Sequence, residues 1–343
     1  MAGIKDVAQA AGVSVATVSR ALSGNGKVSE ATRSKVRRAA EDLGYVVSFN
    51  ASSLASGRSR NIGVVVPTVG RWFFSTVLEG ITNELIEAGY DLTLYNTGGQ
   101  DQHRESVFSD LLLRKRLDAV ITLTLKLQPH EVQQLASVGK PVVAIGGLIP
   151  DIATVRVDDF NLAALATEHL ISHGHRDIAY LGGTEEFEVD FKLASARQDG
   201  YEYALDQGSF PVNDEWLLTA DFTIQGGYRK VRNLLASPRK QPTAVVCASD
   251  EMAFGAILAA RDLGWKVPED LSVVGIDGHD LGELFGLTTI AQDARGQGAA
   301  AVRKVLELLG ERELERDPTE GFYPTEFVAR SSTAAPRSSA LGA

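Results

Sequence analysis

The sequence predicts a small all-α headpiece followed by an α/β body of two lobes with parallel, doubly wound sheets. Three observations lead to this fold class. The first sixty residues are basic, whereas the rest of the chain is acidic. Apolar residues in the first 45 positions recur with helical spacing, and from residue 61 short apolar runs alternate with helical stretches. A chain of 343 residues, 44% of them hydrophobic, is long enough to bury more than one core.

The charge is divided unevenly along the chain. Residues 1–60 hold nine Lys and Arg against four Asp and Glu, a formal charge of +5, so the remainder carries −15 within a net charge of −10. A basic head on an acidic body is typical of a protein that binds a polyanion through the head. A solvated basic helix face has the same composition, so charge alone does not decide between the two.

The headpiece is expected to begin with a short amphipathic helix. Its apolar residues recur at i, i+3, i+4 and i+7, and they are Ile4, Val7, Ala8 and Ala11. Gly12 predicts the end of this helix, and Ser14 is placed to cap the next one. On the second helix, Val18, Ala21 and Leu22 fall on the inward side.

A third helix is expected to begin after Ser29 and to end at Gly44. Its inward residues would be Val36, Ala40 and Leu43. Three short helices with a tight turn between the first two predict a helix-turn-helix.

The second helix has the small side chains that a major-groove helix needs. Val15 and Ala16 let the backbone approach the base edges and offer methyl contact to thymine, and Arg20 can form a bidentate pair with guanine. Hydroxyls nearby can bond phosphates. We expect DNA contacts from Ser14, Val15, Ala16, Thr17, Ser19, Arg20, Ser23 and Lys27. The alternative, an ordinary helical hairpin in a core, leaves an outward face of Ala, Ser and Arg without a purpose.

The segments IKDVAQAAGVSVATVSRAL, VSEATR and LGY resemble the headpiece of the lactose/galactose-repressor family, the LacI-type bacterial transcription regulators. The similarity continues over nearly the whole chain. Gly3 departs from the pattern, because the family usually has Thr or Ser there to cap the first helix. The resemblance implies a regulator that binds pseudo-palindromic double-stranded operator DNA and a small-molecule effector.

The segment VVSFNASSLASGRSRN joins the headpiece to the body. A helix of about eight residues of marginal propensity within it cannot hold alone in water, since isolated helices need about 12–15 residues. The resemblance implies a hinge helix that folds when two copies pair in the minor groove, with Leu54 wedging the central base step and Ala51 allowing close approach. Val47 and Ser48 replace the family's usual Pro-Asn. The alternative, a flexible linker, does not explain the lone leucine.

From residue 61 the body alternates strands and helices. Strands are expected at IGVVVP, DLTLYN, DAVITLT, PVVAIGG, DIAYLGG, AVVCAS and LSVVGID, and helices near residues 73–88, 102–116, 128–138, 160–173, 193–207, 225–236 and 251–263. Near-continuous apolar strands predict parallel sheets covered on both faces. About 270 residues is large for one such sheet, so two doubly wound lobes are expected.

The family resemblance implies a periplasmic-binding-protein-like body whose chain crosses between lobes near residues 160, 290 and 321. The expected domains are a headpiece at 1–46, a hinge at 47–60, an N-terminal lobe at 61–160 and 291–320, a C-terminal lobe at 161–290 and 321–333, and a disordered tail at 334–343. The tail has no leucine heptads, so the tetramerising helix of some family members is expected to be absent and a homodimer is expected.

The cleft between two such lobes is the usual ligand site of open α/β sheets. The resemblance places effector binding on Arg71, Trp72, Phe73, Phe74, Arg197, Phe222, Asp250, Asp277 and Gln292. Carboxylates, an arginine fork and aromatic rings suit a polyol. Structural alternatives exist: Asp250 can cap the helix that begins at Glu251, Arg197 can form an ion pair, and Phe73–Phe74 can belong to the core.

Other classes of site have little support. His173-Gly174-His175 has no Cys or carboxylate at metal spacing, and no phosphate-binding glycine motif follows a strand, so no catalytic residue, metal or cofactor is expected. Cys247 is expected to be a buried, inert thiol. No secretory or membrane-spanning segment is indicated, so a cytoplasmic protein is expected. A solute-binding protein would instead have a signal peptide and no helix-turn-helix.

The sequence therefore predicts a sequence-specific transcription repressor of sugar-uptake or sugar-utilisation genes, released from its operator by a small sugar or sugar derivative. A nucleoside- or phosphometabolite-responsive regulator, or a co-repressor-dependent one, remains the alternative.

Overall fold

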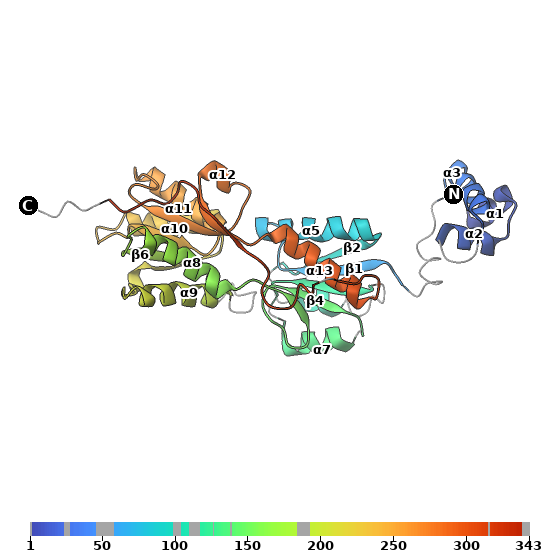
Figure 1. Cartoon of the computed structure of the whole chain (residues 1–343), viewed down its shortest axis with the longest axis horizontal. Coiled ribbons are helices and arrows are strands. Elements are labelled where there is room, and N and C mark those ends of the chain that lie inside the picture. Colours follow the sequence, from blue (N-terminus) through green and yellow to red (C-terminus); the bar gives the residue numbers. More distant parts are fainter. Residues whose placement is uncertain are drawn as a thin grey trace, which may run out of the picture. The chain divides into compact units, whose positions relative to one another are not determined.

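The structure is a computed structural model that describes residues 2–23, 28–45, 58–98, 104–109, 117–125, 127–137, 139–183, 193–314 and 316–337 (Figure 1). The chain forms two compact units. One comprises Met1–Asn61 with Arg116–Asp118, and the other comprises Ile62–Lys115 with Ala119–Ala343.

The described residues of the first unit form the helices α1 (Ile4–Ala11), α2 (Val15–Ser23) and α3 (Glu30–Asp42). Gly12 ends α1 with a left-handed φ of 61°, which permits the tight turn into α2. The hydroxyl of Ser14 accepts the Thr17 N–H at 3.2 Å, and the hydroxyl of Ser29 accepts the Thr32 N–H at 3.3 Å. Both expected helix caps are therefore confirmed.

The three helices share one small core, formed by Val7, Ala8, Ala11, Val18, Ala21, Val36, Ala39 and Ala40. Leu43 was expected to face inward, and this was wrong: it is 39% exposed. The reason is that α3 ends at Asp42, so helical periodicity no longer aims the next side chain, and Tyr45 packs against the core instead. At the start of α1 the Asp6 carboxylate accepts the Gly3 N–H at 2.7 Å, so this end is held without a hydroxyl at residue 3.

The described residues of the second unit form two sheets, each with its own core. The first has the strand order β2-β1-β3-β4-β5, from β1 (Asn61–Val66), β2 (Asp91–Asn96), β3 (Ala119–Leu123), β4 (Val142–Ile145) and β5 (Ala153–Val155). The pairings β1–β3, β3–β4 and β4–β5 are parallel. The helices α5 (Trp72–Ala88) and α7 (Pro129–Ser137) belong to this part of the chain, and residues 104–109 are also helical.

A helix from late in the chain completes the first core. Val302 and Val305 of α13 (Ala294–Leu308) are buried in the same cluster as Ile62 and Ile121. We refer to this first sheet, with α5, α7 and α13, as the N-lobe.

The second sheet, with its helices, forms the C-lobe. Its order is β11-β10-β9-β8-β6-β7, from β6 (Ile178–Gly183), β7 (Leu217–Ala220), β8 (Ala244–Cys247), β9 (Ser272–Asp277), β10 (Thr288–Ala291) and β11 (Glu326–Val328). All its pairings are parallel except β10–β11. Its helices are α8 (Asp159–Ser172), α9 (Leu193–Gln207), a 3₁₀ turn at Asp214–Trp216, α10 (Ile224–Leu235), α11 (Asp250–Asp262) and α12 (Gly282–Phe285).

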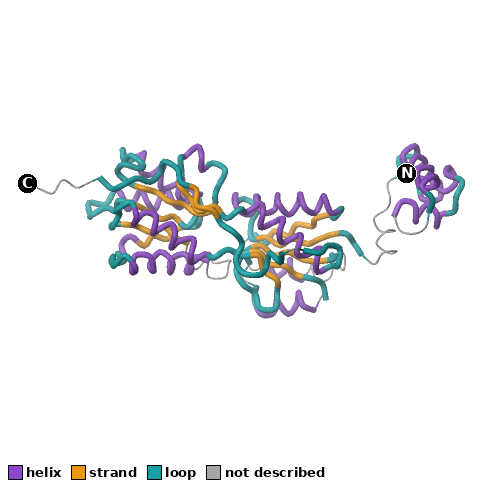
Figure 2. Tube along the Cα trace, viewed as in Figure 1, coloured by secondary structure: helices purple, strands orange, loops and turns teal. Residues whose placement is uncertain are grey.

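The chain passes three times between the two sheets: between β5 and α8, between β10 and α13, and between α13 and β11 (Figure 1). Figure 2 shows the strands of each lobe between layers of helices. The expected fold class, a helix-turn-helix headpiece with a two-lobed body of parallel sheets, is confirmed.

The chain end departs from expectation. Residues 334–337 were expected to belong to a disordered tail, but the Ala334 N–H donates to the Ser272 hydroxyl at 3.1 Å, and Nε2 of His175 lies 2.7 Å from the Ala334 carbonyl oxygen. Two buried C-lobe side chains thus bind the backbone of Ala334, and the Arg337 side chain pairs with Asp270. Residues 338–343 lie outside the described residues.

Candidate functional site

The outward face of α2 carries the residues expected to touch DNA. Val18 and Ala21 are buried on the inner side of this helix. The exposed residues are Ser14, Val15, Ala16, Ser19 and Arg20, and Thr17 is half-buried. Val15 leaves 40% of its surface in water, which suits methyl contact with a base. The side chain of Ser23, and Lys27, Ala51 and Leu54 as a whole, lie outside the described residues.

The start of α2 also suits a phosphate. Oγ of Ser14 lies 2.9 Å from Oγ1 of Thr17, so the cap holds two hydroxyls beside the free N–H groups of the first turn. Those N–H groups and the helix dipole attract an anion. The arrangement can therefore hold the DNA backbone at the helix start while Arg20, further along the helix, approaches the base edges.

A cavity of about 300 Å³ lies where the strands of both lobes end. Its lining includes residues that follow β1, β3, β4, β5, β7, β8 and β10, so the carboxyl edges of both sheets meet around it. Seven of the nine residues expected to bind an effector line this cavity: Arg71, Phe73, Phe74, Arg197, Phe222, Asp277 and Gln292.

Aromatic rings form the apolar walls. Phe73 and Phe74 meet edge to face with centroids 5.8 Å apart, and each packs on the N-lobe core while also lining the cavity. Phe222 has a left-handed φ of 57°. Its ring lies where a side chain on Gly183 would be, because an added Cβ there would come within 2.0 Å of the ring. Gly183 thus makes the position of the Phe222 ring possible.

Arg197 lies almost fully buried in an ion pair. Its Nε and Nη2 lie 2.8 and 2.7 Å from Oδ1 of Asp159, and its Nη1 donates to the Ala248 carbonyl oxygen. Burial lowers the pKa of Arg197, but Asp159 and Asp277 outweigh it and leave that pKa above its usual value. Burial also raises the pKa of the Asp159 carboxyl. The guanidinium therefore presents a fixed edge to the cavity.

Asp277 and Gln292 lie side by side at the ends of neighbouring strands. The amide of Gln292 donates to Oδ1 of Asp277 at 2.7 Å, and the amide of Gln297 donates to the Gln292 carbonyl oxygen at 2.7 Å. Burial raises the pKa of the Asp277 carboxyl, and the nearby Arg197 only partly opposes this.

Asp250, expected to bind the effector, does not line the cavity. Its carboxylate accepts the N–H groups of Gly278 and His279 at 2.9 and 2.8 Å and the Thr289 hydroxyl at 2.7 Å. Three internal donors occupy its oxygens, so it braces the turn that follows β9. Ser249, rather than Asp250, caps α11.

Trp72 also faces elsewhere. Its ring stacks on His279 with centroids 4.5 Å apart, and its Nε1 donates to Oδ2 of Asp280 at 3.0 Å. Because Trp72 and Phe73 are one residue apart on a helix, their side chains differ in direction by about 100°.

Twelve lining residues were not predicted from the sequence, among them Thr124, Asp159, Asp221, Glu251 and Gln297. Glu251 pairs with Arg71 at 2.8 Å across 180 positions of sequence. Its only signal was its place directly after the strand end AVVCASD.

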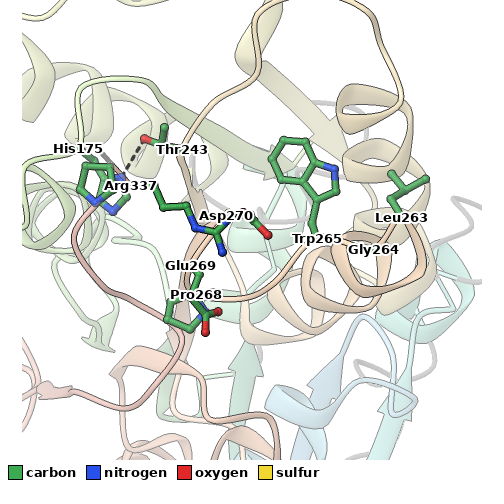
Figure 3. A pocket seen from close by; sticks show the side chains of 10 residues that line it. His175, Thr243, Leu263, Gly264, Trp265, Pro268, Glu269, Asp270 and Arg337 are labelled. Atoms are coloured by element: carbon green, nitrogen blue, oxygen red, sulfur yellow. Dashed lines mark hydrogen bonds and ion pairs between the residues drawn. The ribbon is translucent and has the colours of Figure 1, made fainter. Parts of the chain in front are cut away.

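A second hollow, of about 420 Å³, lies on the C-lobe, and Trp265, Pro336 and Arg337 are among the residues that line it (Figure 3). Nδ1 of His175 lies 2.8 Å from the Thr243 hydroxyl oxygen, and Arg337 pairs with Asp270. Two pairs of its polar side chains are thus bound to each other, and none of the residues expected to bind an effector lines it. We therefore take the cavity at the strand ends as the candidate effector site.

Two further observations concern the described part of the chain. There, no three His, Cys, Asp or Glu side chains are grouped so as to share a metal ion. Within the same residues, no helix combines the length and apolar character needed to cross a membrane. Cys247 is buried, as expected, and burial raises the pKa of its thiol.

Comparison with known proteins gives matches over both units. A family model described as bacterial regulatory proteins, lacI family, matches residues 3–48. Another, described as periplasmic binding proteins and sugar binding domain of LacI family, matches residues 59–319. The HTH-type transcriptional repressor CytR of Escherichia coli (strain K12) is 36% identical over 311 residues, covering 89% of each chain.

Two solved structures resemble the whole chain. The lac repressor dimer bound to operator and the anti-inducer ONPF matches with a TM-score of 0.82 at 26% identity, covering 97% of this chain and 99% of that one. The complex of the transcriptional regulator CelR with cellobiose matches with a TM-score of 0.70 at 29% identity, covering 97% of this chain and all of that one.

Proposed function

The chain belongs to the LacI family of bacterial transcription regulators, and from this membership we propose that it is a repressor released from its operator by a small neutral sugar. It is a sequence-specific DNA-binding regulator, as its relatives are. The genes it controls would then be those for uptake or use of that sugar. We place it in the cytoplasm, where its DNA lies, and assign it no catalytic step.

The pairing of charges in the cavity carries the proposal for the effector. The lining holds four acidic side chains, of Asp159, Asp221, Glu251 and Asp277, against two guanidiniums. Both guanidiniums are already paired, Arg71 with Glu251 and Arg197 with Asp159. A phosphate needs cationic donors that remain available, and this lining offers a surplus of acid instead.

A neutral polyol fits the same lining. Its paired hydroxyls can hydrogen-bond to the Asp277 carboxyl and accept from the Gln292 amide or the edge of the Arg197 fork. The Phe73, Phe74 and Phe222 rings can cover the apolar face of a sugar ring. The balance of charges therefore disfavours the phosphometabolite alternative.

DNA binding is assigned to the exposed face of α2. Arg20 would read a guanine, Val15 and Ala16 would touch thymine methyl groups, and the hydroxyls at the helix start would hold phosphates. Two copies, as in the lac repressor dimer, would present two such helices to a pseudo-palindromic site. The roles of Ala51 and Leu54 in pairing the hinges stay a prediction from the family resemblance.

A thermal-shift panel tests the effector class. The full-length chain is heated with cellobiose, D-ribose, cytidine or glucose 6-phosphate in turn. A ligand at 100 times its dissociation constant adds about 2.7 kcal/mol to the free energy of unfolding. We expect stabilisation by a neutral sugar. Stabilisation by glucose 6-phosphate alone would contradict the charge argument, and stabilisation by cytidine alone would establish the nucleoside alternative.

A further inference from the structure

Two adjacent residues at the start of α5 reach from the N-lobe to the C-lobe. Arg71 is the N-cap residue of this helix and Trp72 its first residue. Arg71 lies on the cavity side, whereas Trp72 lies against the turn that follows β9. We refer to Arg71 and Trp72 together as the clasp.

All three donor nitrogens of Arg71 are bound to the C-lobe. Its Nε donates to Oε2 of Glu251 at 2.8 Å, its Nη1 donates to the Asp221 carbonyl oxygen at 3.0 Å, and its Nη2 donates to the Phe222 carbonyl oxygen. A planar guanidinium suits this arrangement, because its donors are fixed in a fork that reaches an acid and two adjacent carbonyls at once. Three of the five N–H donors of this side chain are therefore used between the lobes, and these bonds hold the guanidinium in one place.

The turn that Arg71 holds carries the aromatic wall of the cavity. Phe222 has its backbone in the left-handed region, which non-glycine residues seldom adopt unless their surroundings impose it. Asp221 accepts the Thr223 hydroxyl at 2.7 Å, which fixes the turn from the C-lobe side. Arg71 fixes the same turn from the N-lobe side, so the direction of the Phe222 ring depends on contact between the lobes.

Trp72 contacts a second turn of the C-lobe, which begins at Asp277. The ring stacks on His279, and its Nε1 bonds to Asp280. Asp250 braces the same turn through the N–H groups of Gly278 and His279. The clasp therefore touches the two C-lobe turns that supply Phe222 and Asp277 to the cavity.

We propose that Arg71 and Trp72 clasp the two lobes together, and that Arg71 is a positioning residue, which sets the Phe222 ring for the effector instead of bonding to the effector itself. In its statement about the effector this inference rests on the proposed function. The clasp itself concerns only the two lobes, so it is testable with no effector present.

The first experiment measures the separation of the lobes without any ligand. Spin labels are placed on Glu87→Cys in α5 and Lys230→Cys in α10, both at exposed positions, while the buried Cys247 stays unlabelled. Electron double resonance then gives the distribution of distances between the labels in the full chain. Arg71→Ala should widen this distribution and shift it relative to the parent.

Arg295→Ala is the matched control. Arg295 also pairs with a carboxylate, Glu79, but this exposed pair joins two helices of the same lobe. The distribution of label distances in Arg295→Ala should match that in the parent. If Arg71→Ala also matches the parent, the clasp does not exist. Arg71→Lys keeps the charge but loses the fork, so an intermediate width is expected. If Arg71→Ala fails to fold, a parental distribution for Arg71→Lys likewise overturns the proposal.

The second experiment separates positioning from direct binding. Affinity for cellobiose, or for the neutral sugar of the panel that binds, is measured in Arg71→Ala, Phe222→Ala and the double variant. If Arg71 acts through the ring, Arg71→Ala weakens binding about tenfold in the parent and has no effect in the Phe222→Ala background. Additive losses would overturn the positioning role. If no sugar of the panel binds, the proposed function fails, while the spin-label distances still decide the clasp.

Discussion

The side-chain amide of Gln292 donates a 2.7 Å hydrogen bond to Oδ1 of Asp277, and the two residues stand at the ends of the parallel neighbours β10 and β9. Asp277 has a φ of 141°, a value that side-chain-bearing residues rarely adopt, and its carboxylate is buried. Both features cost stability, and such features persist where function requires them. We therefore propose that the pair forms the centre of the candidate effector site.

Removing the acid of Asp277 should stabilise the protein at neutral pH. Burial raises the pKa of this carboxyl in the folded chain above its usual value of 3.8. As the pH rises above about 4, the unfolded chain releases this proton while the folded chain retains it, so stability is lost. Asp277→Asn has no carboxyl to titrate, so its stability does not fall with pH for this reason. The two proteins should have similar melting temperatures near pH 4, and the variant should melt progressively higher towards pH 8.

The pH series itself is the check on that prediction. If the difference in melting temperature between the parent and Asp277→Asn stays constant from pH 4 to pH 8, Asp277 titrates normally in the folded chain. The variant should at the same time lose its response to the sugar effector, so the gain in stability and the loss of function would appear together.

The buried ion pair of Arg197 makes a second prediction. Removing one partner leaves the Asp159 charge uncompensated, so Arg197→Ala should lower the free energy of unfolding by about 3–5 kcal/mol. Lys240→Ala breaks the exposed pair with Asp177 and should cost no more than about 1 kcal/mol. Urea denaturation measures both. Equal losses would mean that burial of the Arg197 pair has no energetic consequence.

Gly183 supplies a third test. An added Cβ would meet the Phe222 ring at 2.0 Å, so Gly183→Ala should displace this ring and weaken sugar binding. Gly70→Ala is the control, because its Cβ would meet only the Thr68 hydroxyl oxygen, at 3.7 Å. Calorimetric titration compares the two variants. Unchanged affinity in Gly183→Ala would remove Phe222 from the binding site.

Local signals in the sequence were sufficient for the headpiece. Ser14, Ser29 and Gly12 cap or end helices through bonds within a few residues, so their types and spacing predict the structure. The prediction that Leu43 faces inward was wrong because periodicity does not show where a helix ends. In the body, the strands β5 and β7 were not expected, since three or four residues are too few to show a period.

The sequence shows which residues stand at strand ends, but not which of these residues line the cavity. Asp250 and Asp277 both stand at or just after a strand end, yet one braces a turn through the backbone of Gly278 while the other lines the cavity. That difference depends on a contact between two residues that are 28 positions apart in the sequence. The partner of Arg71 is 180 residues away, and no local pattern records such a pairing.

The headpiece makes a prediction about specificity. Arg20 is exposed on α2, and Arg20→Ala should weaken binding to a selected operator by about 1–3 kcal/mol while changing binding to random DNA little. Lys35→Ala should instead weaken both alike and flatten the salt dependence, if Lys35 meets a phosphate. Equal losses on both DNAs for Arg20→Ala would remove it from base recognition.

Release of operator DNA by the sugar tests the central claim most directly. A labelled operator, obtained by selection with the full-length chain, is bound by the parent and by Asp277→Asn, and fluorescence anisotropy is followed as the stabilising sugar is added. We predict that the sugar weakens operator binding by the parent about 5–150-fold, the usual range for coupled sites, and leaves Asp277→Asn bound. An operator affinity of the parent that does not change with sugar, or release of Asp277→Asn at the same concentrations, would contradict the account.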